Sequence, residues 1–117
     1  MLSSPIIFPH KNSVFSDNAC FQKKELNKIL NIYGRMVSIG EWKDYGISVC
    51  GDFSVFSIYK GYGESPIYSI EKRPKFLKRN GMFSVVGVDG AILKRSNDLG
   101  IILSFFSRKL IKLCKTS

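Results

Sequence analysis

The chain has 117 residues, a length that predicts one domain able to bury a core without disulfide or metal support. Its composition, 44% hydrophobic, is that of an ordinary globular domain, and no apolar run approaches the roughly 18 residues of a membrane span. The formal net charge of +9 favours an acidic partner: nucleic acid, an anionic membrane surface or an acidic protein.

The N-terminal residues 1–20 read as an irregular arm before a single domain at residues 21–117, with a candidate short strand at 14–21. Prolines interrupt the arm and it lacks the basic start of a secretory signal, so we expect a cytoplasmic protein. His10 is the only histidine, and three cysteines are present: Cys20, Cys50 and Cys114. This set cannot complete a zinc site of the usual spacing, so we expect reduced thiols, no metal and no cofactor.

The first strong element is an amphipathic helix over residues 22–40, with Gly40 as its C-terminal stop. Six apolar side chains at helical spacing form its buried stripe: Leu26, Ile29, Leu30, Tyr33, Met36 and Val37. Gly34, inside this helix, costs about 1 kcal/mol relative to alanine. We therefore expect Gly34 to mark a close approach to a neighbouring element.

Five short strands follow, and their short connections predict antiparallel pairing. The expected strands are residues 45–50, 53–60, 66–72, 82–88 and 91–95. Gly-containing pairs at 51–52 and 89–90 predict tight turns. The Gly-rich loop at 61–65 lacks the sequence of a phosphate-binding loop, because neither G-K-[ST] nor G-x-G-x-x-G is present.

A second amphipathic helix ends the chain, with Ser96 or Asn97 as its cap and Asp98 in its first turn. Its apolar stripe contains Leu99, Ile102, Leu103, Phe106, Leu110 and Leu113. Ile101 and Phe105 lie off this stripe and predict an outward ledge that pairs two copies as a homodimer, unless another segment covers it. The whole order predicts an α+β fold: an antiparallel sheet of about five short strands flanked by an N-terminal and a C-terminal helix.

The stretch SIEKRPKFLKRNGMF, residues 69–83, is dense in lysine and arginine. The hairpin that ends at residue 95 is expected to return beside it and unite seven basic residues in one patch: Lys72, Arg73, Lys75, Lys78, Arg79, Lys94 and Arg95. The patch favours contacts to nucleic-acid phosphates, and the other interpretation is a merely solvated surface. Phe76 is expected either to anchor this loop or to stack on a base, and Trp42 either to close the core or to stack.

No catalytic motif is legible. A serine or cysteine nucleophile needs a histidine base, and the only histidine lies in the arm. Glu41, Asp44 and Asp52 offer carboxylate pairs, but they occupy expected turn and cap positions. We therefore expect no enzyme, but a small basic binding module that contacts nucleic acid. The alternative is a regulatory or adaptor protein that docks on an acidic protein surface, and a third interpretation places the basic C-terminal helix on a membrane surface.

Three strings occur in order along the chain: ELNKILNIYGRMVSIGEWKDYGI, PIYSIEKRPKF and AILKRSNDL. Together they resemble an uncharacterised alphaproteobacterial family, the domain of unknown function 2794, over roughly residues 20–107. The resemblance implies a small cytoplasmic bacterial protein. It implies no activity, cofactor or site residue.

Overall fold

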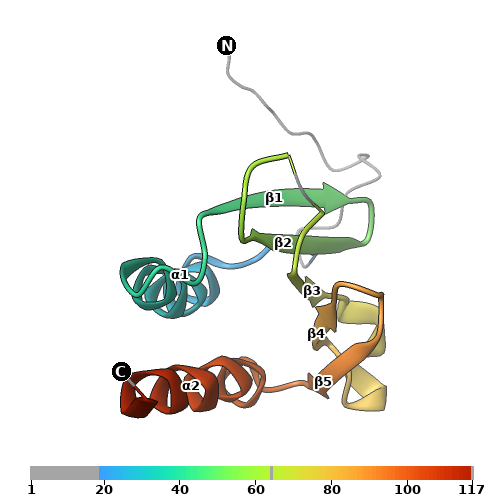
Figure 1. Cartoon of the computed structure of the whole chain (residues 1–117). Coiled ribbons are helices and arrows are strands. Elements are labelled where there is room, and N and C mark those ends of the chain that lie inside the picture. The colour runs from blue at the N-terminus through green and yellow to red at the C-terminus, as the bar shows by residue number, and fades with distance from the viewer. Residues whose placement is uncertain (1–18, 64, 117) are drawn as a thin grey trace.

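Short connections between neighbouring strands give a meander, in which the strands of one antiparallel sheet lie in chain order, β1-β2-β3-β4-β5 (Figure 1). The computed structural model describes residues 19–63 and 65–116, with side chains up to residue 113. The elements are α1 (Lys23–Ser38), β1 (Asp44–Cys50), β2 (Phe53–Tyr59), β3 (Tyr68–Lys72), a 3-10 helix η2 (Pro74–Arg79), β4 (Phe83–Gly87), β5 (Ile92–Ser96) and α2 (Leu99–Thr116). The predicted α+β fold is confirmed.

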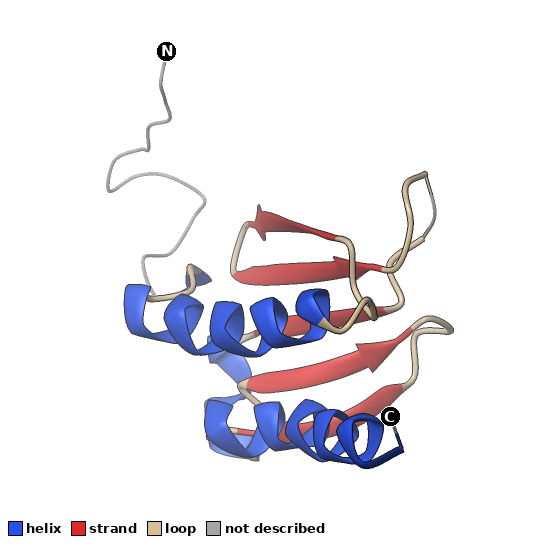
Figure 2. Cartoon of the chain, turned by 60° about the vertical axis from the view of Figure 1, so that its left-hand side comes forward, coloured by secondary structure: helices blue, strands red, loops and turns tan. Residues whose placement is uncertain are grey.

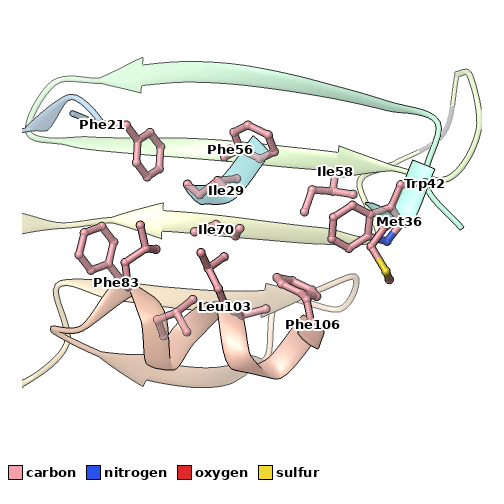
Figure 3. Close-up of a cluster of buried hydrophobic side chains, with 13 residues drawn as sticks. Phe21, Ile29, Met36, Trp42, Phe56, Ile58, Ile70, Phe83, Leu103 and Phe106 are labelled. Atoms are coloured by element: carbon pink, nitrogen blue, oxygen red, sulfur yellow. The ribbon is translucent and has the colours of Figure 1, made fainter. Parts of the chain in front are cut away.

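Both long helices pack on the same face of the sheet (Figure 2). The largest fully buried side chains come from both layers: Phe56, Ile58, Ile70 and Val85 from the strands, and Ile29, Met36, Ile102 and Phe106 from the helices (Figure 3). The predicted stripe of α2 is confirmed, because its first four members are buried and Leu110 and Leu113 pack against the same core. No helix in the described part of the chain is long and apolar enough to cross a bilayer.

The boundaries of α1 follow from its end residues. Gln22 and Glu25 form a capping box, in which the Gln22 N–H donates to Glu25 Oε1 at 2.7 Å. The predicted stop at Gly40 is correct: its φ is +81°, and its N–H donates to the carbonyl of Val37 at 2.9 Å. Two predictions inside α1 are wrong. Val37 is 39% exposed, and a Cβ added at Gly34 would meet nothing within 4 Å, so Gly34 marks no close approach.

The start of α2 also differs from the prediction. Neither Ser96 nor Asn97 caps the helix. Asp98 does, since its Oδ1 accepts the N–H of Gly100 at 2.8 Å, while Ser96 Oγ accepts the N–H of Asp98 at 3.0 Å. The side chain of Asn97 is thereby free to turn away from the helix.

The predicted outward ledge on α2 is wrong for one of its two residues. Phe105 is half-buried, with its ring centroid 5.9 Å from that of Tyr68 and 5.2 Å from that of Phe106. Ile101 is 45% exposed. A homodimer through α2 stays a prediction, and of its two predicted contact residues Ile101 is the exposed one.

Three sequence predictions fall wholly or partly outside the described residues. His10 and residues 1–18 of the predicted arm lie there. Residues 19–21 of the candidate strand at 14–21 are described, and they form no strand. Cys20 and Cys50 are free and exposed, whereas the side chain of Cys114 is outside the described set.

Candidate nucleic-acid interface

The 3-10 helix η2 lies on the side of the sheet opposite α1 and α2 (Figure 1). Pro74 opens it with a fixed φ, and Asn80 ends it with a left-handed φ of 54°. Successive side chains on a strand point to opposite faces, so the register decides which cations of β5 reach η2. Arg95 pairs with Ser84, which pairs with Glu71, and these three residues share the face that the long helices leave uncovered.

Asn97 ties η2 to the junction of β5 and α2. Its Nδ2 donates to the carbonyl of Leu77 at 2.7 Å, and its Oδ1 accepts the N–H of Met82 at 3.0 Å. Its own N–H donates to Asn80 Oδ1 at 3.1 Å. These bonds hold the second half of the connection between β3 and β4 against the end of β5, so they fix the approach of two segments that are far apart in sequence.

Arg79 from η2 and Arg95 from β5 line one small cleft of about 120 Å³, together with Phe76 and Gly81. The guanidinium carbon of Arg79 lies 5.6 Å from the centroid of the Phe76 ring. A Cβ added at Gly81 would lie 2.8 Å from Arg95 Cδ, so the glycine is what allows Arg95 to lie across this position.

Some of the remaining cations of the predicted patch form ion pairs with acidic side chains, and others do not. Arg73 Nε is 2.9 Å from Glu71 Oε1, and the guanidinium carbon stacks 3.8 Å from the centroid of Phe53. Lys75 Nζ is 3.4 Å from Asp52 Oδ2. Of the seven cations in the predicted patch, three are exposed and have no ion-pair partner within residues 19–63 and 65–113, and we call them the basic corner: Lys78, Arg79 and Arg95.

Two members of the predicted patch do not belong to this surface. Lys72 is 3% exposed, and its Nζ contacts Glu25 Oε1 and the carbonyl of Cys20, both at 2.9 Å. Lys94 pairs with the fully buried Val85, beside a register shift in β4, so it lies on the face that carries the long helices. The expectation of one continuous seven-residue patch is therefore wrong.

The comparisons with known proteins support the resemblance seen in the sequence. A protein-family model described as "Protein of unknown function (DUF2794)" matches residues 19–103. The chain belongs to this family. The matched residues of this DUF2794 protein include all five strands, η2 and the whole basic corner. No curated protein and no solved structure matches the chain, so its function has to be argued from the chemistry of its surfaces.

The aromatic residues of this DUF2794 chain serve mainly the fold. Trp42 is 3% exposed and its ring lies 5.0 Å from that of Phe106 in a T-shaped contact, which confirms that it closes the core and rules it out as a stacking platform. Phe76 is half-buried, with Lys75 Nζ 5.7 Å from its ring centroid. Phe76 thus supports the cations around it and is not a free surface for a base.

Asp44 and Asp52, two of the three carboxylates that the sequence offered as a catalytic pair, lie at opposite ends of one strand. Asp44 opens β1 and Asp52 follows its end, so a seven-residue strand separates them. Asp44 Oδ1 accepts the N–H of Tyr45 at 2.8 Å, and Asp52 pairs with Lys75. Glu41 lines a cleft at the C-terminal end of α1, together with Asp89. The expectation that the protein is not an enzyme stays a prediction.

Proposed function

We propose that this protein is a small cytoplasmic binding module that contacts nucleic-acid phosphates through the basic corner and catalyses no reaction. The observation that carries the proposal is the meeting of Arg79 and Arg95, which come from separate segments and have no acidic partner in the described chain. A guanidinium group offers paired donors that match two phosphate oxygens. The free, exposed thiols of Cys20 and Cys50 suit a reducing compartment.

Electrostatics explains why such a corner favours an anion. Two like charges held close together repel, and the hydrogen bonds of Asn97 prevent the segments from moving apart. Arg73 and Lys75, close by, have carboxylate partners that lower their local charge. A phosphate bound between Arg79 and Arg95 would relieve repulsion that no protein carboxylate relieves, which supports phosphate as the ligand.

Binding of this kind is weakly dependent on sequence, because phosphate contacts position a nucleic acid without reading its bases. The buried Trp42 and the half-buried Phe76 offer no platform for stacking. We therefore expect similar affinity for unrelated sequences of equal length.

A salt titration tests the proposal. Fluorescence anisotropy with labelled duplex DNA should give a log–log slope of about −3, because three cations each neutralise about one phosphate. The double substitution Arg79→Gln with Arg95→Gln should reduce the slope to about −1 and weaken binding to several duplex sequences alike. Absence of binding at low salt, to either DNA or RNA, would overturn the proposal.

The same assay separates nucleic acid from the alternative partner. If the corner instead docks on an acidic protein, polyglutamate should compete at charge concentrations at which transfer RNA does not. If nucleic acid is the partner, transfer RNA should displace the probe and polyglutamate should be the weaker competitor, because carboxylates lack the tetrahedral oxygens that two guanidinium groups can share.

A further inference from the structure

A larger cleft, of about 800 Å³, opens at the opposite end of the sheet from the basic corner. Strand β4 begins beside Met82, close to η2, and ends at Gly87, which lines this cleft. The last turn of α1 and the loop after it, the start of β3 and the last turns of α2 also contribute to it. The cleft is therefore built where several elements end, and it shares no lining residue with the corner.

The inside of the cleft is apolar and its rim is charged. The apolar and aromatic side chains that line it are Met36, Trp42, Ile67, Tyr68, Val88, Leu93 and Leu113. Three lysines stand at the rim, Lys60, Lys109 and Lys112, with two acids, Glu41 and Asp89. Asp89 already accepts the N–H of Ala91 at 3.2 Å, within its own turn. An apolar interior of this volume with a few convergent polar groups is typical of a small-molecule site.

The lysines at the rim favour an anionic ligand. Lys109 and Lys112 lie three residues apart on α2, so both project from one side of the helix. The Lys109 Nζ lies 5.2 Å from the centroid of the Phe105 ring. Lys109 forms no ion pair with an acidic side chain of the described residues. Lys60 approaches the same opening from the end of β2. Basic groups on two sides of an apolar cleft favour a ligand that has an anionic head and an apolar tail.

We propose that this cleft binds a free amphiphilic carboxylate of the fatty-acid type. Its acyl chain lies against Trp42 and Tyr68, where contact with water is lost and apolar area is buried. Its carboxylate lies between Lys109 and Lys112, which donate charge-assisted hydrogen bonds. The site is independent of the proposed nucleic-acid contact, and each fails or survives without the other.

The single tryptophan of the chain provides a direct readout. Trp42 lies in the floor of the cleft, so its fluorescence should change saturably when sodium decanoate is added below its micelle concentration. Decyltrimethylammonium, with the same tail and the opposite charge, should bind at least about tenfold more weakly. Equal binding of the two probes would show that the rim has no preference for anions, and would overturn the proposal.

Substitutions at the rim locate the binding. Lys109→Gln with Lys112→Gln should weaken decanoate at least about tenfold. Val88→Asp is a second test that leaves the core untouched, because Val88 is 69% exposed at the cleft; it should weaken decanoate and favour the ammonium probe. As a control, Arg79→Gln with Arg95→Gln removes the same amount of charge elsewhere. It should change the affinity for neither decanoate nor the ammonium probe.

Two results would contradict the inference. One is an equal loss of decanoate affinity in the rim variant and in the charge-matched corner variant, which would mean that only net charge matters. The other is a preference for surfaces over free ligand: cosedimentation with phosphatidylglycerol vesicles that depends on Lys109 and Lys112, without saturable binding of decanoate. Either outcome would replace the free carboxylate with a non-specific or membrane-surface interaction.

Discussion

The two ends of the basic stretch at residues 69–83 lie in opposite environments, one buried and the other exposed. Lys72 ends β3 on the face covered by α1, where it is 3% exposed and paired with Glu25. Arg79 ends η2 on the other side of the sheet, exposed and without a carboxylate partner in the described chain. Only seven positions separate them, so local charge density does not decide whether a cation stabilises the fold or faces a ligand. The element that carries each residue decides it: Lys72 lies in β3 and points to the face of the long helices, whereas Arg79 lies in η2 on the other side of the sheet.

The difference predicts that the two classes of cation respond differently to substitution. A buried, paired charge matters through the partner that compensates it. An exposed, unpaired charge contributes little to folding and acts in binding. Substitutions at the Lys72 end are therefore tested by protein stability, and substitutions at the Arg79 end by binding affinity.

The largest effect is expected for Glu25→Ala, which leaves the Lys72 ammonium buried without its counter-charge. Unfolding in urea should show a loss of about 3–5 kcal/mol. The double substitution Glu25→Gln with Lys72→Met, which removes both charges together, should cost about 1 kcal/mol or less. Equal losses in the two variants would contradict the view that the cost comes from an uncompensated charge.

The next effect concerns the tie between η2 and β5. Asn97→Ala removes the bonds to Leu77 and Met82, so the free energy of unfolding should fall by about 1–3 kcal/mol. The affinity for duplex DNA should fall as well, because the two guanidinium groups are no longer held together. As a control, Asn31→Ala on the exposed side of α1 should alter neither quantity.

A smaller effect is expected for Gly81→Ala, which changes geometry without changing charge. The new methyl group would lie 2.8 Å from Arg95 Cδ and must displace this side chain. The affinity for DNA should fall by about threefold to tenfold, the loss of part of one charge-assisted contact. Anisotropy measurements that give an unchanged dissociation constant would indicate that the position of Arg95 does not matter.

The smallest effect is a pH dependence on the buried side of the sheet. Burial, and then the negative charge of Asp44, raise the pKa of Tyr33 above its ordinary value. The unfolded chain therefore ionises this phenol first, so the stability contribution is complete below about pH 10, the ordinary pKa, and is lost as pH rises through the folded pKa. Absorbance near 295 nm should show one tyrosine that titrates late, and Tyr33→Phe should abolish this phase.

Periodicity and turn residues made most of the fold predictable. The stripe of α2 and the meander of five strands could be read because helical spacing and Gly-containing turns are local signals. The face of the sheet on which Lys72 and Lys94 lie could not be predicted from the sequence. They depend on which face of the sheet the long helices cover, and on the register shift between Val85 and Val86.

The role of Asn97 shows a second limit. Its position before α2 resembles that of a cap, but Asp98 supplies the cap and Asn97 bonds to residues that lie 15 and 20 positions away. Only the tertiary structure brings those groups together. The large cleft was missed for the same reason, because its lining comes from the ends of several elements and no single segment carries its pattern.

The most direct test of the central claim compares two neighbouring residues. Arg95→Gln and Lys94→Gln each remove one positive charge, but Arg95 lies on the side of η2 and Lys94 on the side of the long helices. Binding of labelled duplex DNA at constant low salt should weaken by about tenfold for Arg95→Gln, the loss of one charge-assisted contact, and by less than about twofold for Lys94→Gln. Equal weakening by the two substitutions would contradict the account, because net charge and not the basic corner would then determine binding.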